Sequence, residues 1–91
     1  MTFTVILSPR AKKALFSLDR EDYLRCSAAL NLLGTNPYPG FGGDKEKLKG
    51  YKNRYRLHIG RTYTAIYETY PEDQIVIVAL FGTIGDMHKR Y

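Results

Sequence analysis

The sequence RYRLHIGRTYTAIYETYPEDQIVIVALF, residues 54–81, decides the fold. It contains three apolar-rich runs, at about 54–59, 62–70 and 74–81, and two short turn-forming segments, Gly60-Arg61 and Pro71-Glu72-Asp73, separate them. Runs rich in β-branched and aromatic residues with such boundaries are typical of consecutive strands. The stretch therefore predicts an antiparallel meander of three strands.

Alternation within the first run assigns its side chains to two faces, because successive side chains of a strand point to opposite sides of the sheet. One face is expected to carry the apolar set Tyr55, Leu57 and Ile59. The opposite face is expected to carry the polar set Arg54, Arg56 and His58. The last run, IVIVALF, is apolar on both sides, which predicts a central strand that also pairs in parallel with an N-terminal strand.

The residues before the meander predict one strand and two helices. Residues 3–7 form the strand, and Ser8-Pro9 begins a helix that runs to about Leu18. Asp19 is expected to cap a second helix, with Gly34 as its C-cap, and residues 35–44 form a surface loop. The order β-α-α-β-β-β predicts an α+β fold in which both helices cover one face of a four-stranded, mostly antiparallel sheet. The other face is expected to be open and lined by basic residues.

Composition predicts a single soluble domain, residues 1–91, with a polyanion as partner. The formal net charge is +5, and residues 45–63 hold seven of the fourteen Lys and Arg residues but a single carboxylate, Glu46. The lone Cys26 excludes an intramolecular disulfide and a cysteine-based zinc site. No apolar run approaches the length of a membrane span or a secretory signal. We therefore expect a cytoplasmic protein without a metal or an organic cofactor.

The order of several short motifs resembles the RelE/ParE superfamily of toxins from type II toxin–antitoxin pairs. The motifs are TNPYPG at 35–40, LKGYKNRYRLHIGRTYTAIYE at 48–68 and GDMHKR at 85–90. The resemblance covers nearly the whole chain and implies the RelE-like microbial RNase fold. It also implies a cognate antitoxin as protein partner.

The RelE-like branch of the superfamily cleaves mRNA on the ribosome without a metal. A base removes the ribose 2′-OH proton, the freed oxygen attacks the adjacent phosphate, and a 2′,3′-cyclic phosphate results. The resemblance implies three catalytic residues, Arg56, His58 and His88. Basic residues around them are expected to bind RNA, namely Lys47, Lys49, Lys52, Arg54, Arg61, Lys89 and Arg90.

Two positions depart from the pattern of the family. Thr64 follows Tyr63 where relatives usually carry Arg, and Thr83-Ile84 replace a basic pair after the last strand. The loss of these cations predicts a weakened nuclease. It also leaves open a ParE-like or catalytically decayed toxin that acts by protein binding, as in inhibition of DNA gyrase. A generic basic nucleic-acid-binding domain outside the family is the third alternative.

Several of these residues also have plain structural interpretations. His58 and His88 can be solvated side chains without a role, and the lysines of residues 45–52 can simply solvate a loop. Tyr55, Tyr63 and Tyr67 are interpreted as core residues, and Cys26 as a small apolar filler.

Overall fold

A computed structural model describes residues 2–40 and 44–85 of the chain. Its elements follow in the order β1 (Thr4–Leu7), α1 (Pro9–Phe16), α2 (Arg20–Asn31), the 3₁₀ helix η1 (Leu32–Gly34), β2 (Lys45–Lys47), β3 (Arg54–Ile59), β4 (Tyr63–Tyr70) and β5 (Ile75–Thr83). In the described residues, no helix combines the length and the apolar character that crossing a membrane requires.

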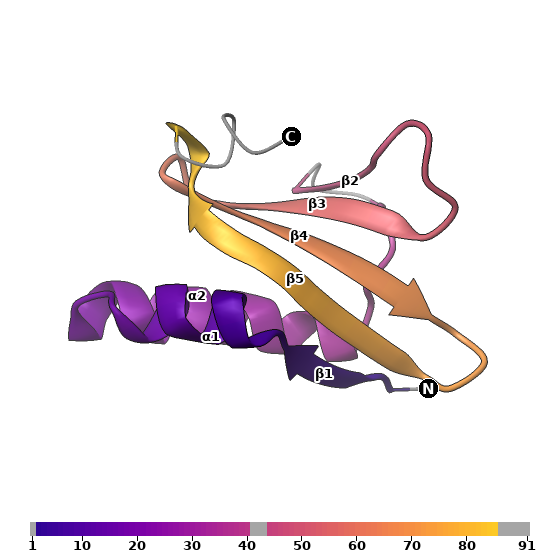
Figure 1. Cartoon of the computed structure of the whole chain (residues 1–91), viewed down its shortest axis with the longest axis horizontal. Coiled ribbons are helices and arrows are strands. Elements are labelled where there is room, and N and C mark those ends of the chain that lie inside the picture. The colour runs from indigo at the N-terminus through magenta and orange to yellow at the C-terminus, as the bar shows by residue number, and fades with distance from the viewer. Residues whose placement is uncertain (1, 41–43, 86–91) are drawn as a thin grey trace.

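The described strands form one sheet in the order β1-β5-β4-β3-β2. Strand β1 is parallel to β5, and the other neighbours are antiparallel, so the predicted meander and the central place of β5 are confirmed. Both helices lie on one side of this sheet (Figure 1). The predicted count of four strands is wrong, because Lys45–Lys47 pairs with β3 as a fifth, edge strand. The KEK sequence has no apolar alternation, so only its hydrogen bonds with β3 make it a strand.

Both predicted helix starts are confirmed by capping contacts. Ser8 Oγ accepts a hydrogen bond of 3.1 Å from the Ala11 N–H, and Asp19 Oδ1 accepts one of 2.9 Å from the Asp22 N–H. Helix α1 ends at Phe16, two residues before the predicted Leu18.

The predicted role of Gly34 as a helix C-cap is wrong. Gly34 lies in η1, and among the described glycines only Gly50 and Gly60 have positive φ. A Cβ at position 34 would meet the Phe3 carbonyl oxygen at 2.8 Å. Gly34 is therefore required for the close approach of η1 to β1, where the Phe3 N–H donates to the Gly34 carbonyl.

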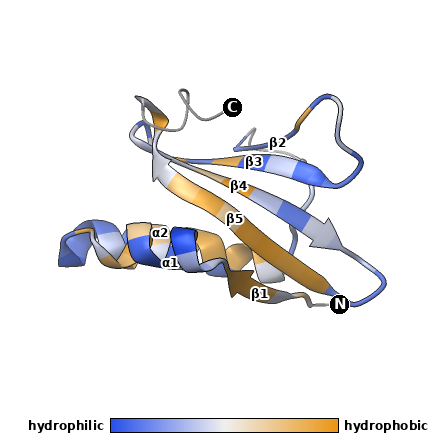
Figure 2. Cartoon of the chain, in the orientation of Figure 1, coloured by the Kyte–Doolittle hydropathy of each residue, from blue (hydrophilic) through white to orange (hydrophobic). Residues whose placement is uncertain are grey.

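The core fills the space between the helices and one face of the sheet. It joins Ala11, Leu15, Cys26 and Leu30 of the helices to residues of β3, β4 and β5 that include Tyr55, Leu57, Tyr67 and Val78. Strands β1 and β5 are the most uniformly hydrophobic elements, whereas the helices carry both polar and apolar residues (Figure 2). Stacked aromatic rings, Tyr55 on Tyr67 and Tyr63 on Phe81, complete this layer.

The face of the sheet opposite the helices is called the open face here. Strand β3 alternates strictly between buried residues toward the helices and partly exposed residues on the open face, as the sequence predicts. The expectation of an uncovered face needs one correction. Thr64 and Ile66 of β4 lie on the open face by alternation, yet each is only 1% exposed. The β4 part of this face is therefore closed at Thr64 and Ile66. The open-face residues of β3 and β5 and the end of β4, which includes Glu68 and Tyr70, are partly or fully exposed.

Candidate functional site

The open-face side chains of β3 are the centre of the candidate site. Arg54, Arg56 and His58 are placed on one face by the extended backbone, and their side chains are 31%, 26% and 36% exposed. Alternate residues of a strand are separated by roughly 6.6 Å. The three groups thus form a row that solvent reaches from one side.

Glu46 of β2 contacts the middle residue of this row, Arg56. It is the register partner of Arg56, whose Nε donates to Glu46 Oε1 at 2.6 Å, and the Arg56 Nη2 contacts the same oxygen. His58 Nε2 lies 3.7 Å from that oxygen. The hydrogen bonds from Arg56 lower the pKa of the Glu46 carboxyl, so Glu46 is ionised at neutral pH. One carboxylate oxygen, Glu46 Oε1, therefore lies next to both the guanidinium of Arg56 and the imidazole of His58.

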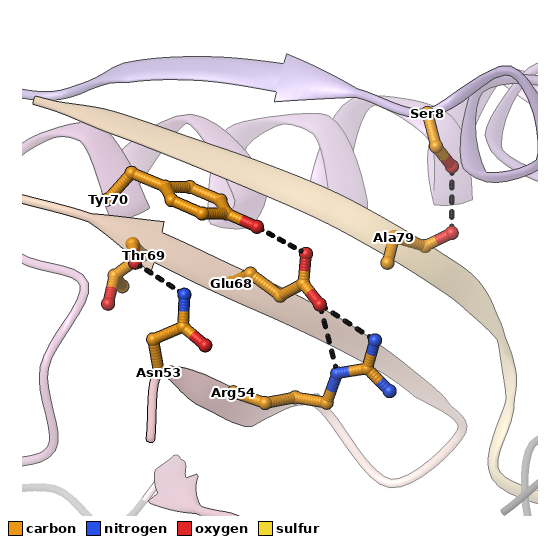
Figure 3. Close-up of polar contacts among 7 residues, drawn as sticks. All are labelled: Ser8, Asn53, Arg54, Glu68, Thr69, Tyr70 and Ala79. Atoms are coloured by element: carbon orange, nitrogen blue, oxygen red, sulfur yellow. Dashed lines mark hydrogen bonds and ion pairs between the residues drawn. The ribbon is translucent and has the colours of Figure 1, made fainter. Parts of the chain in front are cut away.

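A second carboxylate, Glu68 of β4, holds Arg54. Its Oε2 accepts hydrogen bonds from Arg54 Nε at 3.2 Å and Nη2 at 2.7 Å, and its Oε1 accepts one of 3.0 Å from the Tyr70 hydroxyl. Figure 3 shows these three side chains directed toward one another. The contact with Glu68 raises the pKa of Arg54 and that of Tyr70. The Arg54 guanidinium also lies 4.9 Å from the centroid of the Tyr51 ring, in a cation–π contact.

These pairs change the electrostatics that the sequence predicts. Opposite charges at such distances cancel much of each other's field, so Arg54 and Arg56 do not present two bare cations. The exposed cations near this row, at the rim of the site, are Lys49 and Lys52 in the segment between β2 and β3 and Arg61 in the turn after β3. Lys47 is also exposed, but it pairs with Tyr55 and so lies on the opposite face of β2 from Glu46. Sequence reasoning missed Glu46 and Glu68 as site residues. The signal for Glu46 was its place as the sole carboxylate of the basic segment.

Thr64 faces His58 across β3 and β4, at the position where the family pattern has Arg. Its Oγ1 donates a hydrogen bond of 3.0 Å to the Leu57 carbonyl oxygen. The hydroxyl is therefore used within the sheet, in a site that is 1% exposed. Ile84 lies beyond the end of β5, and its N–H donates to the Thr62 carbonyl. Neither residue supplies a charge to the row.

The family model of the ParE toxin of the type II toxin–antitoxin system parDE matches residues 5–83. The chain belongs to this toxin family. The match rules out the alternative of a generic nucleic-acid-binding domain outside the family. None of the curated protein sequences matches the chain.

Solved toxins of the RelE type share the fold of this toxin. RelE in the archaeal RelE–RelB complex from Pyrococcus horikoshii has a TM-score of 0.78 and 29% identity, over 93% of this chain and 98% of that one. A mutant of E. coli RelE in the free state has a TM-score of 0.76 and 19% identity, over 97% and 90% of the two chains. A chain of the E. coli DinJ–YafQ toxin–antitoxin complex has a TM-score of 0.73 and 18% identity, over 96% of this chain and 98% of that one. The expected RelE-like fold is confirmed.

The remaining predicted site residues of the toxin do not join the central cluster. Lys47, Lys49 and Lys52 are exposed on β2 and the segment after it, and Arg61 is exposed at the turn after β3. His88, Lys89 and Arg90 lie outside the described residues. Of the predicted site residues within the described ranges, Arg54, Arg56 and His58 lie together on the open face of β3, and their roles remain predictions.

The structural interpretations of the tyrosines and of the cysteine are confirmed. Tyr55, Tyr63 and Tyr67 are all buried, and Tyr63 and Tyr67 hydrogen-bond through their hydroxyls to Asp22 and to the Pro37 carbonyl. Burial raises the pKa of the Cys26 thiol, which disfavours the nucleophilic thiolate.

Proposed function

We propose that this toxin is an endoribonuclease that cleaves mRNA on the ribosome, as the RelE-like resemblance implies. The observation that carries the proposal is the contact of Arg56, Glu46 and His58 on a face that solvent reaches. A phosphate-binding cation beside two groups that can exchange protons is the minimum that this chemistry requires.

In the proposed reaction, His58 accepts the proton of the ribose 2′-OH. An imidazole can do this near neutral pH, where a lysine ammonium has no free electron pair. The 2′ oxygen then forms a bond to the adjacent phosphorus, and the bond from phosphorus to the 5′ oxygen breaks. Arg56 stabilises the charge that builds on the phosphoryl oxygens. The 5′ oxygen takes a proton, and the products are a 2′,3′-cyclic phosphate and a 5′-OH end.

The source of the proton for the leaving group is proposed to be His88, on the basis of the family motif alone. Glu46 has a double effect in this scheme. Its ionised carboxylate orients the Arg56 guanidinium, but it also competes with the RNA phosphate for the same donors. Together with the missing cation at Thr64, this competition supports a slower enzyme than a site with an additional Arg.

The test is incubation of the purified toxin with translating ribosomes and a defined mRNA. Mapping of the transcript ends and chemical analysis of the new 3′ ends should reveal cleavage with a 2′,3′-cyclic phosphate. Arg56→Ala should lower the rate by about ten- to a hundredfold, the worth of a charge-assisted contact made in the transition state. His58→Ala should lower it by about 10²- to 10⁴-fold, the usual contribution of a general base. Lys12→Ala, an exposed position of α1, is the matched control. Intact mRNA with the unaltered toxin contradicts the proposal.

Inhibition of DNA gyrase is the second candidate, because the family model that matches is that of a ParE toxin. In this case the open face binds a protein. Arg54 and Arg56 can then keep their ion pairs with Glu68 and Glu46, because neither has to bind an RNA phosphate. A supercoiling assay separates the two functions. Loss of supercoiling with intact mRNA selects the gyrase candidate, and the opposite pattern selects the nuclease.

A cognate antitoxin is proposed as the protein partner. The support is that similar solved structures are toxin–antitoxin complexes, such as RelE–RelB and DinJ–YafQ. The excess of exposed Lys and Arg at the rim of the site favours an antitoxin with an acidic segment that covers this rim. A short reading frame that overlaps or abuts the gene of this toxin is the expected source of the antitoxin, and its co-expression should restore growth and yield a complex whose dissociation rises with salt.

A further inference from the structure

A surface hollow of about 330 Å³ lies next to the Arg54 end of the row. Its lining comes from the residues just before β3, the end of β4 and the turn that follows β4. The lining includes Lys52, Asn53, Thr69, Tyr70, Glu72 and Asp73. This volume is at the lower end of the range for small-ligand sites.

The walls of the hollow are held in place by hydrogen bonds on two sides. Asn53 Nδ2 donates to the Thr69 carbonyl at 2.9 Å, and the Thr69 N–H donates to the Asn53 carbonyl at 2.9 Å. The Tyr70 hydroxyl donates a hydrogen bond to Glu68, and Arg54 donates to the other oxygen of the same carboxylate (Figure 3). The Asp73 N–H closes the turn on the Tyr70 carbonyl at 3.1 Å. The aromatic ring and the amide are therefore oriented before any ligand binds.

The chemistry of the lining disfavours an anion and favours a flat, neutral group with both donors and acceptors. The carboxylates of Glu72 and Asp73 repel a phosphate, but they accept hydrogen bonds from ring and amino N–H groups. The Lys52 ammonium and amide groups can donate to a carbonyl oxygen. The tyrosine ring offers a stacking surface, as in single-strand RNA recognition, where unstacked bases lie on aromatic side chains and bond through their edges.

Guanine is the base that matches this set. Its Watson–Crick edge presents two adjacent N–H donors for a carboxylate and one carbonyl acceptor for a cation. Uracil and cytosine each lack one part of this pattern, and adenine has no carbonyl. We propose that the hollow binds a guanine base of the RNA, beside the phosphate that is cleaved at Arg56 and His58. This inference rests on the proposed nuclease function and names a base subsite for it.

The binding test is independent of cleavage. Amide NMR signals of the intact toxin are followed while guanosine, adenosine, cytidine or uridine is added, each without a phosphate so that the basic rim does not contribute. Guanosine should shift the signals of Asn53, Tyr70 and Glu72 and bind about tenfold more tightly than the other three nucleosides, as expected for one bidentate base contact. The double variant Glu72→Gln with Asp73→Asn should remove this preference. Equal binding of all four nucleosides, or guanosine shifts confined to other regions, overturns the inference.

The cleavage test uses the same variants on the ribosome. Cut sites of the unaltered toxin should share a guanine at one fixed distance from the cut, and Tyr70→Ala or the double variant should flatten this preference while Lys12→Ala retains it. Cleavage without any guanine preference overturns the inference and leaves the nuclease proposal intact. Guanosine binding in the hollow without cleavage supports the base subsite and refutes the nuclease proposal. The two failures are therefore distinguishable.

Discussion

Replacing Glu46 with Gln should tighten the binding of single-stranded RNA by about fivefold at low salt. In the free toxin the Glu46 carboxylate occupies the donors of Arg56 and lies 3.7 Å from the His58 imidazole. Two unit charges at about 4 Å interact by about 1 kcal/mol in a water-like dielectric. The water-like value applies because the Glu46 side chain is 47% exposed. Glu46→Gln removes a repulsion of this size between the Glu46 carboxylate and a phosphate bound at Arg56, which corresponds to about a fivefold change in the dissociation constant.

The assay is fluorescence anisotropy with a labelled oligonucleotide that lacks 2′-OH groups, so that binding is measured without cleavage. Titrations at several salt concentrations give the slope of log K against log salt. One additional phosphate neutralised by Arg56 should steepen this slope by about 0.7 for a single strand. Glu21→Gln is the matched control, since it removes the same charge from an exposed site at the start of α2.

The variant separates two roles for Glu46. If the carboxylate only competes with phosphate, Glu46→Gln tightens binding and the cleavage rate is retained or rises. If the carboxylate also takes part in proton transfer, binding tightens while cleavage falls. Binding that is unchanged or weaker, with a slope equal to that of the Glu21→Gln control, refutes the reasoning about the Arg56 contact. Stability should change little, because an exposed ion pair is worth about 0.2–1 kcal/mol.

Three further predictions concern stability. Because the folded-state pKa of Glu46 is lowered, its ion pair stabilises the fold above the ordinary carboxyl pKa, and this stabilisation is lost as the pH falls through the folded value. The free energies of urea unfolding of wild type and Glu46→Gln should therefore converge at acidic pH and differ by no more than about 1 kcal/mol at neutral pH. Tyr67→Phe should lower the free energy of unfolding by about 1–2 kcal/mol, since it leaves the buried Pro37 carbonyl without its donor; an unchanged urea midpoint contradicts this. Gly34→Ala should cost about 1–3 kcal/mol by pushing η1 away from the Phe3 carbonyl, and a thermal midpoint equal to that of wild type would show that β1 moves freely.

Much of the fold follows from local patterns in the sequence. The capping oxygens of Ser8 and Asp19 start the two helices within one turn of themselves, so no distant residue is needed to predict them. The period-two alternation of β3 assigns Arg56 and His58 to the open face by backbone geometry alone. The apolar character of β5 on both faces predicts its central place in the sheet.

The tertiary structure alone decided the electrostatics of the candidate site. Glu46 contacts Arg56 only because the polar KEK segment pairs with β3 in one register, and Glu68 contacts Arg54 only through the register of β4. A shift of one residue would turn either carboxylate to the opposite face. Register is set by the sum of many contacts along paired strands, and no single residue encodes that sum. The sequence therefore determined which residues face solvent, and the fold determined which charges meet there.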